Sequence, residues 1–209
     1  MQRSRMAGGA QGERRTVRFM GGRDREEVLG FLKEIDERFL PPLSSPHRKG
    51  SIEGYLDYML AEGMGKVLLY ENEGRMEGLF SYRFEGDRLD TMYLCAAGVK
   101  EPRSGGVALY RMCEAMVDAE RDKDIRRVWA KTWEGNHDSR RFLEKIGLKP
   151  RETVPGDYGG IRTTVTYEGA WPDIVGFFDR RKKSHREPPL PELKRELSGR
   201  EGDGGTGLM

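Results

Sequence analysis

The chain has 209 residues, of which 36% are hydrophobic and 34% are charged, so it can bury one sizeable core but not two large ones. The formal net charge is +2, but residues 1–15 and 180–209 each carry +3, which leaves −4 on the part between them. This charge distribution argues against a nucleic-acid-binding surface on the folded part, because such a surface needs clustered Lys and Arg.

The first half of the chain predicts strands and helices in the order strand, helix, helix, strand, strand. The helices are indicated by apolar residues at three- and four-residue spacing. A proline-rich loop separates them, and an Asn72-Glu73-Gly74 turn joins the last two strands. Residues 1–15 have no periodicity, and we expect a disordered basic tail there. The predicted ranges are strand 16–20, helix 25–39, loop 40–50, helix 51–63, strand 66–70 and strand 76–84.

The second half of the chain predicts an alternation of strands and helices that ends in a hairpin. An apolar run followed by an amphipathic helix opens it, and a strand rich in aromatic and β-branched residues follows. Past the last helix the composition changes to Pro, Glu, Arg and Gly, which indicates a second disordered tail. The predicted ranges are strand 92–99, helix 109–119, strand 128–133, helix 139–146, strands 149–154 and 161–167, an added helix within 169–182, and the tail 183–209.

A glycine-containing turn joins the strand at 92–99 to the helix at 109–119. Its sequence is Arg103-Ser104-Gly105-Gly106-Val107-Ala108. A strand that enters such a turn and continues as a helix leaves unpaired N–H groups at the positive end of the helix dipole. This arrangement is typical of a phosphate-binding site, although an ordinary tight turn is the alternative interpretation.

These six residues fit the spacing Q/R-x-x-G-x-G/A, with Arg103, Gly106 and Ala108 in the fixed positions. The spacing resembles the pyrophosphate-binding turn of the GNAT superfamily of acyl-CoA-dependent N-acetyltransferases. Residues 136–148 resemble a second signature of that superfamily, N-x-x-[AS]-x-x-[FL]-Y-x-K-x-G-[FL]. The residues in register with it are Asn136, Ser139, Phe142, Lys145, Gly147 and Leu148.

The resemblance implies an α+β protein with the GNAT (acyl-CoA N-acyltransferase) fold, in which helices flank a mixed, mostly antiparallel sheet of about seven strands. It implies that residues 16–168 form the GNAT domain. It also implies an N-acetyltransferase that transfers an acetyl group from acetyl-CoA to a primary amine, which attacks the thioester directly. Acetyl-CoA is then a co-substrate.

The resemblance further implies where acetyl-CoA binds. Its pantetheine arm would pair with backbone groups around Ala97 and Val99, where one strand diverges from the next, and Gly98 would allow a bulge or a close approach. The amides of Ser104, Gly105, Gly106, Val107 and Ala108 would hold the pyrophosphate, and Arg103 would add charge.

The side-chain amide of Asn136 would bond the pantetheine arm, since it can both donate and accept. The alternative role of Asn136 is to cap the helix that follows it, through a different atom.

The resemblance also suggests catalytic groups. Counting back thirteen residues from Arg103 gives Asp90, which corresponds to the carboxylate base of the histone-modifying branch; a solvated strand end is the alternative. Many members carry a tyrosine as general acid where this chain has Leu143. A tyrosine elsewhere, Tyr93 or Tyr158, would take that role, or transfer would be weak.

Three functional hypotheses follow: an N-acetyltransferase, an acetyl-CoA-binding regulatory module with little or no transferase activity, and a nucleic-acid-binding protein that uses its basic ends. The acceptor is left open between small-molecule and peptide amines, and a homodimer is compatible with the sequence. Cys95 and Cys113 are interpreted as buried apolar side chains, which fits a reducing cytoplasm. The histidines are scattered, so no metal is predicted, and no apolar run is long enough to span a membrane.

Overall fold

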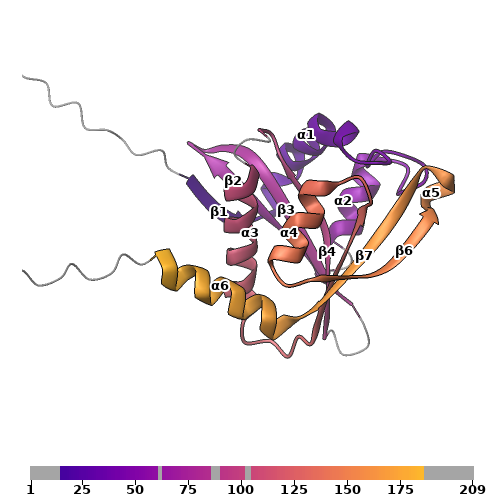
Figure 1. Ribbon diagram of the computed structural model, residues 1–209. Coiled ribbons are helices and arrows are strands. Elements are labelled where there is room, and N and C mark those ends of the chain that lie inside the picture. The colour runs from indigo at the N-terminus through magenta and orange to yellow at the C-terminus, as the bar shows by residue number, and fades with distance from the viewer. Residues whose placement is uncertain (1–14, 61–62, 86–89, 102–104, 186–209) are drawn as a thin grey trace, which may run out of the picture.

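The structure, a computed structural model, describes residues 15–60, 63–85, 90–101 and 105–185. Within these residues, seven strands form one sheet in the order β1-β2-β3-β4-β5-β7-β6 (Figure 1). Neighbouring strands are antiparallel except β4 and β5, which are parallel. The strands are β1 (Arg15–Phe19), β2 (Gly65–Asn72), β3 (Arg75–Glu85), β4 (Thr91–Val99), β5 (Arg127–Trp133), β6 (Lys149–Gly156) and β7 (Arg162–Ala170).

Helices cover both faces of this sheet. On one face α3, α4 and α6 pack against the sheet, and on the other face α1 and α2 do so. A short turn of helix, α5, lies at the tip of the β6–β7 hairpin (Figure 1). The helices are α1 (Arg25–Ile35), α2 (Ile52–Leu60), α3 (Gly105–Glu120), α4 (His137–Lys145), α5 (Asp157–Gly160) and α6 (Trp171–His185), with 3-10 turns η1 (Gly22–Asp24) and η2 (Asp36–Arg38).

Strand β2 shows why the sheet has two apolar faces. Leu68 and Tyr70 belong to the core under α3, α4 and α6, whereas Val67 and Leu69 belong to the core under α1 and α2. Successive side chains of a strand point to opposite faces, so a strand that is buried on both sides is a continuous apolar run. The sequence shows this pattern at residues 67–70, which follow Lys66.

Most predicted elements are present with shifted ends. Strand β1 begins at Arg15, inside the range expected to be tail. The helix predicted over residues 25–39 is α-helical only to Ile35 and continues as the 3-10 turn η2. The predicted Asn72-Glu73-Gly74 turn is present, with positive φ at Glu73 (51°) and Gly74 (77°), as a tight hairpin turn requires. Helix α6 extends to His185.

A buried carboxylate joins the end of α3 to the sheet. Glu120 is 0% exposed, and its Oε1 accepts hydrogen bonds from Lys66 Nζ and Tyr82 Oη, both at 2.6 Å. Burial alone would raise the pKa of Glu120. The hydrogen bonds from Lys123, Lys66 and Tyr82 outweigh this effect and hold the pKa below its usual value. Glu120 is therefore an ionised anchor between α3, β2 and β3.

Candidate functional site

Strands β4 and β5 are paired over only part of their length. Four residue pairs are in parallel register, and the last of them is Leu94 opposite Ala130. Beyond that point β4 stays paired with β3 as far as Val99, whereas β5 stays paired with β7 to its end. The second halves of the two strands therefore diverge, and their facing edges are not paired with each other.

A β-bulge lies at the start of this divergence. Ser81 of β3 pairs with Ala96, and Tyr82 pairs with Leu94, so Cys95 is the extra residue on β4. A bulge bends its strand and increases the local twist. The bulge therefore accounts for the departure of β4 from β5 directly after Leu94.

Gly98 is not the residue at which β4 bulges, and it lies against the Ile35 side chain of α1. A Cβ at this position would lie 2.4 Å from Cδ1 of Ile35 on α1, a distance that atoms cannot adopt. Glycine therefore lets the Ile35 side chain of α1 pack closely against β4, and the bulge lies three residues earlier, at Cys95.

The backbone of β4 beyond the bulge presents polar groups to the open edge. Lys100 donates its N–H to Glu77 O on the β3 side. Because backbone groups alternate along a strand, those of Ala97 and Val99 face the other way, toward β5. The Val99 carbonyl accepts a hydrogen bond from Arg38 Nη1 at 2.8 Å. Ala97, which is exposed, thus offers both its N–H and its C=O at the position where the resemblance implies that pantetheine binds.

The N-terminus of α3 follows β4 and is open to solvent at Gly106 and Val107, whereas Ala108 is buried. A Cβ at Gly106 would meet no atom within 4 Å, so the packing of the described residues does not require glycine there. Close approach of a ligand to the backbone is a physical reason for it. Two other predicted phosphate-binding residues, Arg103 and Ser104, lie outside the described residues.

Asn136 lies on the β5 side of the divergence and caps α4. Its Oδ1 accepts a hydrogen bond from Ser139 N at 3.1 Å, which is the alternative role considered for this residue. The side-chain nitrogen makes no hydrogen bond within the part of the chain that the structure describes. Asn136 can therefore cap the helix with its oxygen and still donate to a ligand.

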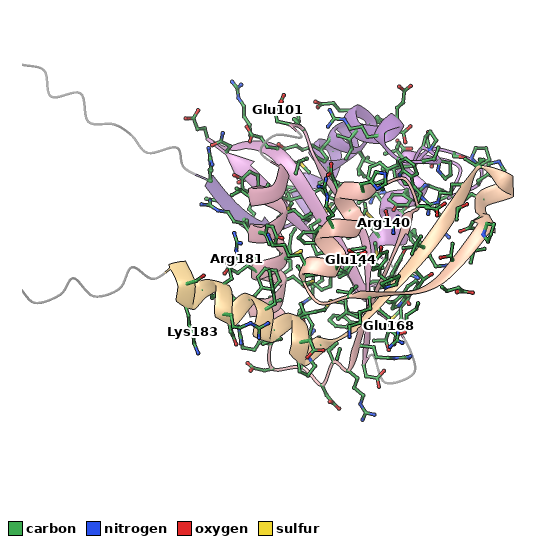
Figure 2. All side chains as sticks on the ribbon, viewed as in Figure 1. Glu101, Arg140, Glu144, Glu168, Arg181 and Lys183 are labelled. Atoms are coloured by element: carbon green, nitrogen blue, oxygen red, sulfur yellow. The ribbon has the colours of Figure 1, made fainter. Side chains whose placement is uncertain are left out.

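Helix α4 is held against β7 by a hydrogen-bonded tyrosine. Tyr167 Oη accepts from Arg140 Nε and donates to Glu144 Oε1, both at 3.0 Å; Figure 2 labels Arg140 and Glu144 on α4. Leu143, on the same helix, is 5% exposed and lies in the core. The position at which many GNAT proteins carry a catalytic tyrosine is therefore an apolar packing position in this chain.

Asp90 lies directly before β4, away from the divergence. Its carbonyl accepts from Arg126 N at 2.8 Å, and its carboxylate pairs with Arg126 Nε at 3.7 Å. Five positions separate it from Cys95, which is about 16 Å of chain at about 3.3 Å per residue. The structure therefore does not bring Asp90 and the bulge together.

Tyr93 and Cys95 lie next to the divergence, and both are protonated at neutral pH. The Tyr93 ring stacks on Trp129 of β5 with 4.1 Å between centroids, and burial raises the pKa of the Tyr93 hydroxyl well above its usual value. Burial also raises the pKa of the Cys95 thiol to about 12. Because the thiolate is the reactive form of cysteine, Cys95 is a poor nucleophile.

Two arginines surround one tyrosine on the α1–α2 side of the sheet. Arg48 comes from the loop before α2, Tyr158 from α5, and Arg162 from the start of β7. The guanidinium carbons of Arg48 and Arg162 lie 5.4 and 4.4 Å from the centroid of the Tyr158 ring. We call these three residues the arginine–tyrosine cluster.

The cluster reaches the bulge through one side chain. Arg48 Cζ lies 5.6 Å from the centroid of the Tyr55 ring, and Tyr55 Oη donates to Cys95 O at 3.4 Å. The sequence predicts Tyr55 only as a residue on the apolar face of the helix at 51–63. It does not indicate a functional role for Arg48 or Arg162. Arg48 lies more than a hundred residues before Tyr158 and Arg162 in the chain, so no local pattern identifies the cluster.

The described residues also have a bearing on a metal site, a membrane span and disulfides. No group of three or more His, Cys, Asp or Glu side chains suitable for a metal ion occurs among them. No helix among them is long and apolar enough to cross a membrane. Both cysteines are free thiols, and Cys113 is buried.

No protein-family model matches the sequence, and no curated protein does. Solved structures do match the fold. An acetyltransferase of the GNAT family from Streptococcus pneumoniae matches with a TM-score of 0.58 and 13% identity, over 75% of this chain and 99% of that one. A ribosomal-protein-alanine N-acetyltransferase from Brucella melitensis matches with a TM-score of 0.59 and 16% identity, over 74% and 99% of the two chains.

A third match is a ribosomal L7/L12 alpha-N-protein acetyltransferase in complex with coenzyme A, with a TM-score of 0.60 and 15% identity, over 75% of this chain and 93% of that one. The chain therefore has the GNAT fold, and the α+β architecture that the two motifs imply is confirmed.

Proposed function

We propose that this chain, built on the GNAT fold, is an N-acetyltransferase that transfers an acetyl group from acetyl-CoA to a primary amine. One observation supports the proposal above the others: β4 and β5 diverge at the Cys95 bulge, close in the chain to the open N-terminus of α3. The matched structures are acetyltransferases, and one of them holds coenzyme A.

In this proposal acetyl-CoA lies along the open edge of β4. Its pantetheine arm pairs with the backbone of Ala97 and with the free side-chain nitrogen of Asn136. The amides of residues 104–108 bind the pyrophosphate at the positive end of the α3 dipole, with Arg103 as an added cation. The exposed Gly106 leaves room for the phosphate groups to approach the backbone.

The reaction is a direct attack. The nitrogen lone pair of the amine forms a bond to the thioester carbon, the carbon–sulfur bond breaks, and coenzyme A leaves as the thiolate while the amine loses a proton to water. A backbone N–H next to the bulge stabilises the negative oxygen of the tetrahedral intermediate. An acyl-cysteine intermediate is disfavoured because the Cys95 thiol is protonated.

The reaction can proceed without a general acid at position 143. A thiol with a pKa near 8.5 is about 1.5 units above neutral pH, so its departure as thiolate costs only about 2 kcal/mol. Tyr93 and Tyr158 remain the candidates for a hydrogen bond to the leaving sulfur. Tyr93 cannot act as a base, since burial keeps its hydroxyl protonated.

The buried Leu143 also supports a second candidate function. A chain with no hydroxyl at this position and with Asp90 far from the bulge could hold acetyl-CoA as a regulatory module and transfer its acetyl group poorly.

Two measurements on the full chain separate these functions. Thermal unfolding with acetyl-CoA, coenzyme A or ATP tests the site: ligand at 100 times its dissociation constant adds about 2.7 kcal/mol of stability, and we expect this for both CoA species but not for ATP. Release of free coenzyme A with a panel of amines tests the chemistry. Binding with amine-dependent release supports the transferase, binding without release supports the regulatory module, and absence of binding contradicts both.

A further inference from the structure

We propose that the amine acceptor also carries an anionic group, and that Arg48 and Arg162 bind this group beside the Tyr158 ring. The inference rests on the proposed transferase function and names its substrate class: small primary amines bearing a carboxylate, phosphate or sulfonate. It is carried by one buried and one half-buried guanidinium that have no ion-pair partner in the described part of the chain.

Of the two arginines, Arg162 gives the stronger support for an anion site. Its residue is 8% exposed, its Nε donates to Thr164 Oγ1 at 2.9 Å, and its Nη1 donates to Leu40 O. Both partners are neutral, and no carboxylate in the described ranges lies within ion-pair distance of the guanidinium. Burial lowers the pKa of Arg162, with a smaller contribution from the like charge of Arg48.

Arg48 repeats the pattern from another segment. It is half-buried, its Nε donates to Pro41 O at 2.8 Å, and its guanidinium faces the rings of Tyr158, Tyr55 and Phe39 at 5.4 to 5.8 Å. Again no described carboxylate pairs with it. Two like charges around one ring repel each other, and an anion bound between them would remove this cost.

The carboxylates of the neighbouring segments are already engaged. Asp157 accepts from Tyr158 N at 2.8 Å and is also bound by the Thr164 hydroxyl. Glu85 accepts from Arg83 and from Trp129 Nε1, the latter at 3.1 Å. Asp157 offsets part of the Arg162 charge through the shared Thr164 hydroxyl, but neither carboxylate lies within ion-pair distance of Arg48 or Arg162. Two arginines against one such carboxylate leave the cluster with a net positive charge. It therefore disfavours polycationic amines and favours an acceptor with an opposite charge.

The cluster lies at a suitable place for an acceptor. Tyr55 contacts Arg48 with its ring and the Cys95 carbonyl with its hydroxyl, so one tyrosine side chain spans the interval between the cluster and the bulge. A small molecule of similar length can place its anionic group on the arginines and its amine at the thioester. A guanidinium binds carboxylate and phosphate oxygens in a two-pronged manner, which fixes the orientation of the acceptor.

The test uses matched pairs of amines that differ in the anionic group: glycine with glycinamide, phosphoethanolamine with ethanolamine, and taurine with ethylamine. Acetyl-CoA-dependent release of coenzyme A gives kcat and KM for each, and titration calorimetry on the CoA-loaded protein gives the affinity for the same amines. The variants are Arg162→Gln and Arg48→Gln, with Arg162→Lys as a conservative change. Arg151→Gln is the control, because Arg151 is an exposed arginine of the same hairpin.

We expect the anionic member of at least one pair to be preferred by about tenfold or more in kcat/KM, as one charged hydrogen-bonded contact provides. Arg162→Gln and Arg48→Gln should raise the KM for that amine by about 10- to 100-fold, while the KM for acetyl-CoA and the affinity for the neutral partner stay within about twofold. Arg151→Gln should change none of these values. The pair that shows the preference identifies the type of anion.

Equal use of neutral and anionic amines, or a preference that survives in both glutamine variants, would overturn the inference and leave the transferase intact. If no amine is acetylated, calorimetry decides between two outcomes. Binding of an anionic amine that depends on the two arginines supports the anion site and contradicts the transferase function. Absence of such binding contradicts both proposals. Should Arg162→Gln not fold, Arg48→Gln gives the same comparison at a half-buried position.

Discussion

Cys95 combines an irregular backbone position with a side chain that could act as a nucleophile. It is the bulged residue of β4, and its thiol donates a hydrogen bond to the Tyr93 carbonyl at 3.6 Å. With a pKa of about 12, the thiol is not ionised at neutral pH, so it cannot accept the acetyl group as a thiolate. We expect Cys95→Ala to keep kcat within about threefold, since a catalytic nucleophile would cost far more. Steady-state kinetics measures this, and mass spectrometry of the wild-type chain should detect no acetylated Cys95 with acetyl-CoA alone; its accumulation would contradict direct attack.

Asp90 is a second residue whose location limits its chemistry. Its carboxylate pairs with Arg126 before β4 begins, well away from the bulge. We expect Asp90→Asn to lower kcat/KM by no more than about threefold and to leave its pH profile unchanged, whereas loss of a general base costs about 10²- to 10⁴-fold. The measurement is kcat/KM against pH for both chains. A loss of that larger size, with a shifted profile, would restore Asp90 as the base.

A substitution at Gly106 distinguishes an effect on packing from an effect on ligand binding. A methyl group there meets no protein atom, so Gly106→Ala should keep the fold or stabilise it by up to about 1 kcal/mol, the gain expected for alanine in a helix. The same methyl group would approach a bound pyrophosphate, and we expect the KM for acetyl-CoA to rise by about fivefold or more, equivalent to about 1 kcal/mol. Chemical unfolding and kinetics give the two values.

Gly30→Ala is the matched control, because Gly30 is an exposed glycine of α1 whose added Cβ also meets no atom. It should give a similar stability change and no change in KM. If both variants leave the KM for acetyl-CoA unaltered, the phosphates do not bind at the α3 N-terminus.

At the scale of elements, Glu120 fixes α3 relative to β2 and β3. Glu120 is fully buried, whereas the Lys66 side chain is 37% exposed and can be solvated when it loses its partner. We therefore expect Glu120→Gln to lower the free energy of unfolding at pH 7 by about 2 kcal/mol, the range for hydrogen bonds to a charged group. Glu114→Gln, on the same helix at a more exposed ion pair, should cost no more than about 0.5 kcal/mol.

The pH dependence of this anchor has a definite sign. Because the native pKa of Glu120 is lowered, its stabilising contribution is complete above the ordinary value of 4.5 and is lost as pH falls through the native value. Urea unfolding at pH 7 and pH 4 should therefore show a smaller difference between wild type and Glu120→Gln at the lower pH. A difference that grows on acidification would mean that the carboxyl is not ionised in the native state.

The elements differ in how far the sequence determines them. Residues 66–70 and the Asn72-Glu73-Gly74 turn are predictable because apolar runs and positive φ are local properties. The position of the bulge is not predictable, since it depends on the register with β3. It lies at Cys95 and not at Gly98, which packs against Ile35. The arginine–tyrosine cluster is also unpredictable, because its members meet only after the β6–β7 hairpin folds over the loop before α2.

At the scale of the whole molecule, the sheet separates two apolar layers. Helices α3 and α4 lie on one face and carry the α3 N-terminus and Asn136, while α2 and the loop before it lie on the other and carry Tyr55 and Arg48 (Figure 1). In the proposed function, acetyl-CoA and its acceptor approach the divergence from opposite faces, which suits direct attack without a covalent enzyme intermediate.

In the proposed function, acetyl-CoA binds along the diverging edge of β4 and at the N-terminus of α3. Amide hydrogen exchange with and without saturating acetyl-CoA tests it most directly, because the backbone itself provides the contacts. We expect slower exchange in peptides that contain residues 95–99 and 104–108, and little change in α6 or in β1. Unchanged exchange in both of these peptides at saturating acetyl-CoA, or protection confined to other elements, would contradict the account.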